Sequence, residues 1–421
     1  MPATERAREA ATTPSTAEPS PQAVAPERKR ATAEEAQPRK PAVPAKSKPQ
    51  KPQPPGRTLS SLLQYVGAFR FPEGKIGASL FGYGGTAIAF NPANNSLFVV
   101  GHDWDQAIAE VKIPDTVVNS NQLSELPTAK VLQPFVRILP RVPNFSLEGN
   151  VKIGGLLVVD EQLIGTAYVF YDAAGKAVKS HFRLDSLNLS SAKVEGLFQV
   201  GDLGGGFVGG YMAPVPDEWK DELGARYVTG QAALCIIGRT SSGPAAFGFD
   251  PGKLGSAPAP LTPYVYYPLK HPLGPMGEKN PYFNGTTEIN GVFFVPGSRS
   301  VLFFGSHGTD EIGYGEADTF RDGNRTSKGY HSRNGKYQYQ VWAYDVLDLL
   351  AVKKKTKKPW EIKPYDVWRL TFPIDEGGKH IGGVAFDPTT GRLFVSQRGA
   401  AQTRFDPGPL IHVFKLAEGG K

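Results

Sequence analysis

One string of residues occurs near both ends of the folded part of this chain, and it constrains the fold most. Residues 89–99 contain A-F-N-P followed by L-F-V, and residues 385–395 contain A-F-D-P followed by L-F-V. Each copy predicts a strand, a tight turn at the Asn-Pro or Asp-Pro step, and a second strand. A third apolar strand follows each copy, at 108–113 and at 410–416. We therefore expect the chain to consist of similar sheet units.

Elements of this unit recur five times. A short element with two small residues opens each unit, at 83–86, 153–156, 208–211, 289–292 and 381–384. A second strand is expected at 97–101, 163–167, 234–238, 302–306 and 393–397, and a third near Ile108, Val178, Ala246, Val341 and Ile411. Small residues suit strands that crowd a common axis, where a Cβ atom would collide.

A fourth, aromatic-rich strand is displaced by one unit. It is expected at 131–139, 194–200, 263–269 and 365–372, the fifth copy does not follow Leu416, and a matching segment at 65–72 precedes the first unit. A first strand that joins the last sheet closes a ring and leaves no sheet edge unpaired. The sequence therefore predicts an all-β, five-bladed β-propeller over 58–417, with four antiparallel strands per blade. Six blades are the alternative, because 295–365 is long enough to contain another.

Residues 1–57 have a different composition, rich in Ala, Pro, Lys and Glu. They contain eleven Lys and Arg against six Asp and Glu, so they account for most of the net charge of +7. With so few large apolar side chains we expect a disordered tail, and no specific nucleic-acid binding by the folded part. No signal-peptide pattern and no membrane-spanning apolar run is expected, and the compartment stays open.

Four strings carry a resemblance to a known class of protein. GGTAIAFNP, VGHDWDQ, YQVWAYD and GGVAFDPTTGRLFVSQRGA resemble segments of uncharacterised bacterial propeller proteins of the β-propeller superfamily. The resemblance covers the folded region and implies the fold. It implies no catalytic residues, and the repeated Gly-His and Trp-Asp signature of WD40 repeats is absent.

In a four-stranded blade, the connections from strand two to three and from strand four to the next blade lie on one face, here called the top face. Alignment of the second strands on their leucines places His102, Tyr168, Arg239, His307 and Arg398 at equivalent corners. The residues before the inner elements are Gly82, Lys152, Phe207, Glu288 and His380. Two tiers of polar side chains are thus expected at one mouth. The predicted ligand-binding residues are His102, Asp103, Lys152, Tyr168, Arg239, Glu288, His307, His380 and Arg398.

Such a pocket is rich in histidine and arginine. Arginine binds carboxylate, sulfate or phosphate through two parallel hydrogen bonds, which points to an anionic ligand. A metal site of His102, Asp103, His307 and His380 is a weaker alternative, since no two histidines have a diagnostic spacing. We expect no metal and no cofactor. The lone Cys235, in an apolar run, is expected to be a buried, inert thiol.

Two functional hypotheses follow. The first is a non-catalytic propeller, expected to be a monomer, that binds an anionic small molecule or glycan on its top face. The second is a hydrolase or lyase acting on a glycan or polyanion, for which the candidate acids are Asp103, Glu288 and Asp310 or Glu311. The long connection from His307 to Lys336 is expected to cover the mouth as a lid.

Overall fold

The structure is a computed structural model that describes residues 56–57, 60–231, 238–315, 329–376, 379–402 and 406–417. The predicted disordered tail, 1–57, lies outside these ranges except for Gly56 and Arg57, and Cys235 lies outside them altogether. Residues from Gln53 to Lys421 form one compact unit.

The described residues form five antiparallel sheets of four strands each. Blade 1 contains β2 (Ile88–Asn91), β3 (Ser96–Val100), β4 (Ala107–Lys112) and β5 (Lys130–Arg137), and blade 2 contains β6 (Val151–Val159), β7 (Gln162–Val169), β8 (Lys179–Leu184) and β9 (Val194–Gln199). Blade 3 contains β10 (Met212–Pro214), β11 (Tyr227–Thr229), β12 (Ala246–Phe249) and β13 (Thr262–Val265). Blade 4 contains β14 (Glu288–Phe294), β15 (Ser300–Gly308), β18 (Tyr337–Asp345) and β19 (Asp366–Leu370). Blade 5 contains β20 (His380–Asp387), β21 (Arg392–Ala401), β22 (Gly408–Leu416) and β1 (Leu63–Arg70).

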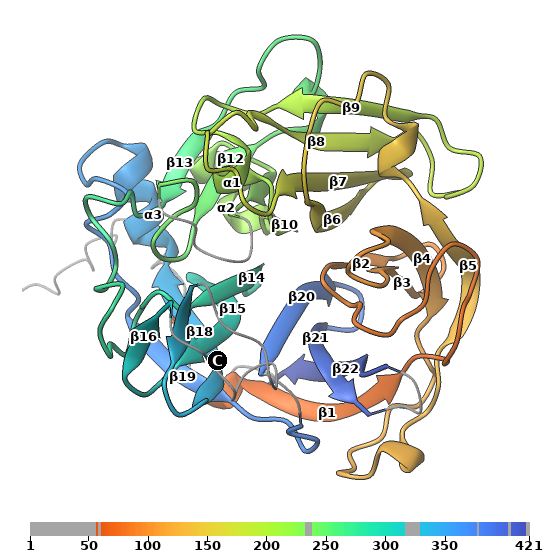
Figure 1. Ribbon diagram of the computed structural model, residues 1–421. Helices are drawn as coiled ribbons and strands as arrows, with labels where there is room; N and C mark the ends of the chain where they lie inside the picture. The colour runs from red at the N-terminus through yellow and green to blue at the C-terminus, as the bar shows by residue number, and fades with distance from the viewer. Residues whose placement is uncertain are drawn as a thin grey trace, which may run out of the picture. The chain divides into compact units, whose positions relative to one another are not determined.

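The five sheets form a closed ring around their first strands (Figure 1). β2 contacts β6, β6 contacts β10, β10 contacts β14, β14 contacts β20, and β20 contacts β2. Each blade therefore packs against two neighbours, and the five inner strands surround a common axis. The predicted five-bladed β-propeller is confirmed.

The ring is closed by the N-terminal strand, as the displaced fourth strand predicted. β1 pairs antiparallel with β22, from Leu63 opposite Leu416 to Arg70 opposite Leu410. The two ends of the folded chain are thus hydrogen-bonded in blade 5. This pairing completes the last sheet with the first strand of the sequence.

Two expectations about blades 3 and 4 need correction. The second strand of blade 3 is β11, Tyr227–Thr229, and not 234–238, whose first four residues lie outside the described ranges. The six-blade alternative is wrong: the described part of 295–365 completes blade 4 and adds only the hairpin of β16 (Ile312–Tyr314) and β17 (Tyr330–Ser332). An apolar run without clear alternation gives no register, which is why the first error arose.

The small residues at the start of the inner strands have the role expected of them. The strand register shifts between Ile153 and Gly155, and likewise between Ile381 and Gly383, so these pairs form bulges. A Cβ atom on Gly382 would lie 1.7 Å from the carbonyl oxygen of Gly85 in the next blade. Glycine is therefore required where neighbouring inner strands approach each other.

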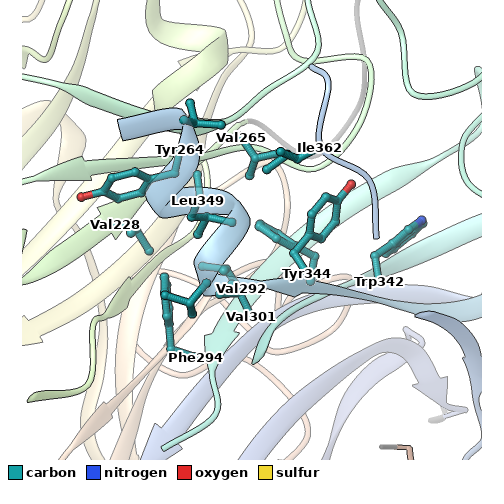
Figure 2. Packing of buried hydrophobic residues seen from close by; sticks show 14 of the residues in the cluster. Val228, Tyr264, Val265, Val292, Phe294, Val301, Trp342, Tyr344, Leu349 and Ile362 are labelled. Carbon is teal, nitrogen blue, oxygen red and sulfur yellow. The ribbon is translucent and has the colours of Figure 1, made fainter. Parts of the chain in front are cut away.

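Apolar side chains between the blades form the core. Figure 2 shows the cluster between blades 3 and 4, where Val265, Phe294 and Trp342 are buried. Helix α3 (Val346–Lys353) packs against β13 and adds Leu349 to this cluster. The described helices α1 (Gly205–Val208), α2 (Asp217–Leu223) and α3 are all short.

Candidate functional site

The first two strands of a blade end together on the top face, and three blades place polar residues there in the same cross-strand pair. These pairs are Lys152 with Tyr168 in blade 2, Glu288 with Ser306 in blade 4, and His380 with Arg398 in blade 5. In each blade the pair lies just before the bulge of the inner strand. We call the six residues the mouth of the propeller.

An ion pair joins the mouth to the loop of blade 1. Lys152 Nζ lies 2.7 Å from Asp103 Oδ2 and donates to the Asp103 carbonyl oxygen, also at 2.7 Å. The Lys152 side chain is almost fully buried, and Nζ stands 5.1 Å from the centre of the Trp104 ring. The Gln106 side chain holds the same loop by donating to the Asp103 carbonyl and accepting from the Ile153 backbone N–H. The positive charge of Lys152 is therefore balanced within the protein.

A second polar contact, between a histidine and a carboxylate, crosses from blade 4 to blade 5. His380 Nδ1 lies 2.9 Å from Glu288 Oε2, and both side chains are largely buried. A carboxylate stabilises the charged form of a neighbouring imidazole. The Glu288 carboxylate thus already has a basic partner at the mouth.

The pKa of the Tyr168 hydroxyl depends on burial and on three charged groups. Burial raises the pKa of its phenol well above the usual range, the charge of Arg398 acts to lower it, and the charges of Asp103 and Glu288 act to raise it. The phenol is therefore neutral and can donate a hydrogen bond. The charges of Arg398, Asp103 and Glu288 thus all act on the pKa of this one hydroxyl.

Arg398 differs from the other charged groups of the mouth. Its Nε atom is buried and has no hydrogen-bond partner among the described residues, and the Cγ atom of its side chain lies beside Gly382 at the start of the inner strand. A buried, unsatisfied cationic donor costs free energy unless an acceptor reaches it. This guanidinium is therefore the group of the mouth best able to bind a ligand.

Two of the nine predicted site residues lie away from the mouth. His307 is buried in β15, where Nδ1 is 2.9 Å from Thr287 Oγ1 and Nε2 is 2.7 Å from the Asn280 carbonyl oxygen. Burial lowers the pKa of His307 to about 4, so it is neutral near pH 7. Ser306, one residue earlier, occupies the corner, because blade 4 is out of register with the leucine alignment by one residue.

Arg239 is the second residue that the alignment misplaced, because β11 ends at Thr229. Its Nε atom donates to the Asp172 carbonyl oxygen at 3.0 Å and Nη2 donates to the Ala173 carbonyl oxygen at 2.8 Å. Arg239 and Tyr168 nevertheless line one pocket of about 70 Å³, between the loops of blades 2 and 3, with Phe170 in its wall. Arg239 thus lies beyond Tyr168, outside the mouth itself.

His102 and the acids of the long connection complete the predicted set. His102 follows β3 in blade 1, its Nδ1 accepts from the Trp104 backbone N–H at 3.1 Å, and its ring meets Tyr83 edge to face at 5.5 Å. Asp310 is paired with Lys336 and Asn334, and Glu311 is exposed. The predicted lid falls partly on residues 316–328, which lie outside the described ranges.

The described ranges contain neither a candidate metal centre nor a helix suited to span a membrane. No group of three or more His, Cys, Asp or Glu residues there could hold a metal ion. In particular, both ring nitrogens of His307 are within hydrogen-bond distance of other groups, Thr287 Oγ1 and the Asn280 carbonyl oxygen. No helix of the described chain has the length and apolar character needed to cross a membrane.

Two features of the site were missed by the sequence analysis. Ser306 was not proposed as a corner residue, because the leucine alignment is out of register by one residue in blade 4. Trp104 was treated only as part of a motif, although its side chain is 77% exposed on the top face. An exposed tryptophan in a polar loop was the available signal.

Comparison with known proteins adds little to this geometry. No family model and no curated protein matches the chain. Among solved structures, the chain is similar to one described as Kuenenia stuttgartiensis hydrazine synthase, at 12% identity and a TM-score of 0.31. The match covers 74% of this chain and 61% of that one, and with so low a score we draw no functional argument from it.

Proposed function

We propose that this propeller binds an anionic ligand at the mouth of its top face and does not catalyse a reaction. The observation that supports the proposal most is the buried Nε atom of Arg398, which has no acceptor among the described residues. Lys152 is balanced by Asp103, and Glu288 has His380 as a partner. A ligand carboxylate, phosphate or sulfate supplies the acceptors that this guanidinium needs.

Tyr168 supports the same proposal. Its pKa is raised by burial, so the hydroxyl keeps its proton at neutral pH and can donate to an anion held by Arg398. A guanidinium together with a neutral hydroxyl is a common way to bind and orient a carboxylate. The anionic small molecule or glycan expected from the sequence fits this pair.

The alternative function, a hydrolase or lyase, has less support. Such chemistry needs one carboxyl group that carries a proton and a second that does not. Asp103 is in an ion pair with Lys152, and Glu288 Oε2 is within hydrogen-bond distance of His380 Nδ1. Hydrogen bonds from Asn334, the Glu311 backbone N–H and Lys336 lower the pKa of Asp310 to about 2, which makes it a poor proton donor. We therefore propose binding as the function.

The test is to measure the binding of small anions to the Arg398→Met variant. Isothermal titration with galacturonate, citrate, phosphate and sulfate at low salt should show binding of at least one of them to the wild type. Loss of a charge-assisted contact in the variant should weaken that binding by about tenfold or more. Arg392→Met is the matched control, because Arg392 begins the same strand at the opposite end. Equal affinity in Arg398→Met and Arg392→Met contradicts the proposal.

A further inference from the structure

The exposed aromatic side chains of this protein are distributed unevenly over its surface. Among the described residues the exposed large aromatics are Tyr83, Trp104, Phe145, Phe170, Tyr171, Tyr282 and Tyr314. Every one of them lies in a connection from strand two to three, or from strand four to the next blade. All seven are therefore on the top face, and we call them the aromatic rim.

The tryptophans on the opposite face of the propeller are not exposed in this way. Its connections join strands one to two and three to four, and they carry Trp219 and Trp360, of which the first is buried and the second partly buried. Trp219 also donates through Nε1 to the Ser298 carbonyl oxygen at 2.7 Å, as a structural tryptophan does. Exposed aromatic rings cost free energy in water, so their collection on one face indicates a binding surface.

The rim is densest next to the mouth. Tyr83 and Trp104 belong to blade 1, whose inner strand contacts those of blades 2 and 5. Phe170 and Tyr171 follow directly on β7 of blade 2, the strand that contains Tyr168. Tyr168 belongs both to the mouth and to the wall of the pocket that contains Phe170. The rim and the mouth are therefore continuous.

The rim does not have the composition of an interface core between two proteins. Polar groups lie between its rings. Trp104 stands between Asp103 and Asp105 in the sequence, and the Lys152 ammonium lies over its ring. Tyr171 precedes Asp172, and the Tyr282 backbone N–H donates to Asn280 Oδ1. The core of a protein interface is depleted of such charges. A sugar ring, in contrast, places C–H groups on an aromatic face and hydroxyl groups beside neighbouring polar atoms.

We infer that the top face binds a linear polysaccharide that carries carboxylate groups, with its sugar rings on the aromatic rim and a carboxylate at Arg398. The inference rests on the proposed function, because the mouth supplies the site for the charge. It extends that function from a single anion to a chain of sugars. The chain passes from the mouth over blades 1 and 2, where five of the seven rings lie.

The experiment is affinity electrophoresis of the full chain in native gels that contain polygalacturonate, alginate or hyaluronate, with the neutral polymer dextran as reference. At least one acidic polymer should retard the wild type, and dextran should not. In Trp104→Ala and Tyr171→Ala the dissociation constant should increase by about tenfold, since each change removes one exposed ring from the contact. Leu132→Ala is the control, because Leu132 is exposed on the outer strand β5 of blade 1, away from the top face.

Failure of this inference can be told apart from failure of the proposed function. If monomeric galacturonate binds in an Arg398-dependent manner, but a hexamer binds no more tightly and Trp104→Ala and Tyr171→Ala behave as wild type, only the polysaccharide is excluded. If no acidic polymer retards the protein, the rim is a protein interface instead and the inference is wrong. Unchanged binding of monomeric galacturonate by Tyr171→Ala shows that the mouth is intact in that variant.

Discussion

At the scale of single residues, the shared A-F-[ND]-P string is explained by side chains that close a tight turn. The Ala93 backbone N–H donates to Asn91 Oδ1 at 3.1 Å, and the Thr389 backbone N–H donates to Asp387 Oδ1 at 2.8 Å. Asn and Asp form such turns because the short side chain reaches the backbone two residues later. The string is therefore a device for connecting the first two strands, and it lies on the face opposite the mouth.

Another single residue, His412, makes the ring closure sensitive to pH. Its Nε2 lies 2.6 Å from Gln397 Oε1, its Nδ1 lies 3.0 Å from the Tyr65 hydroxyl, and its ring stacks on Phe372 at 3.9 Å. The Gln397 oxygen can only accept, so Nε2 carries the proton and Nδ1 accepts from Tyr65. The neutral imidazole thus connects β21, β22 and β1.

Burial lowers the pKa of His412 from 6.5 to about 3. Below pH 6.5 the unfolded chain binds a proton that the folded chain does not, so stability is lost as the pH falls from 6.5 towards 3. We expect this residue to cost about 2 kcal/mol of unfolding free energy between pH 6.5 and 5. Urea denaturation at both values should show a pH dependence smaller by that amount in His412→Gln. The exposed His271→Gln serves as control, and an unchanged pH dependence in His412→Gln contradicts the assignment.

At the scale of elements, the bulged inner strands determine how closely the blades approach the axis. A Cβ atom on Gly155 would lie 2.2 Å from the Gly210 carbonyl oxygen, and one on Gly154 would lie 2.0 Å from the Gly209 carbonyl oxygen. Both contacts join blade 2 to the segment that leads into β10. Since backbone atoms cannot move aside as a flexible side chain can, these blades must have glycine there.

The Gly155→Ala variant tests this packing. We expect it to lower the free energy of unfolding by about 3 kcal/mol or more, because the added methyl group pushes two inner strands apart. Gly255→Ala is the matched control, since a Cβ atom there meets nothing within 4 Å. Thermal unfolding followed by circular dichroism gives the comparison, and equal midpoints for the two variants rule out close packing at Gly155.

At the scale of the whole molecule, the ring depends on one strand that is distant in sequence from its partner. β1 covers the edge of β22 through pairs that run from Tyr65 opposite Phe414 to Phe69 opposite Ile411. Before β1, Arg57 is tied to blade 4, because its Nε atom lies 2.8 Å from Asp345 Oδ2. If β1 were detached, the unpaired edge of β22 would be exposed to other chains.

Truncation tests the closure. A chain that begins at residue 57 should unfold cooperatively as a monomer, because it keeps β1 and its pairing with β22. A chain that begins at residue 72 should lose cooperative unfolding and associate, since the edge of blade 5 is then unpaired. Size-exclusion chromatography and urea denaturation distinguish the two chains. A shorter chain that remains monomeric with an unchanged transition shows that β1 does not close the ring.

The sequence by itself determined the architecture of this protein. The recurring glycine pairs, the A-F-[ND]-P turns and the displaced fourth strand are local features of the sequence. They predict the inner strands, the connections between strands one and two, and the strand that completes the last blade. Together they predicted the number of blades and the closing strand. They also predicted that Lys152, Glu288, His380 and Arg398 lie at one end of their strands, because alternation and turn positions determine where a strand ends.

Only the tertiary structure decided which of these side chains meet. Asp103 and Lys152 are 49 residues apart, and Glu288 and His380 are 92 residues apart, so these two contacts exist only because neighbouring blades pack. Blade 4 is out of register with the leucine alignment by one residue, so Ser306 lies at the corner and His307 is buried. A pattern of apolar residues does not reveal such a shift. In a strand that is buried on both faces, successive residues do not alternate between apolar and polar, so the sequence does not show which residue faces which side. The unsatisfied Nε atom of Arg398 is likewise a result of packing, since it depends on which acceptors the nearby blades place around it.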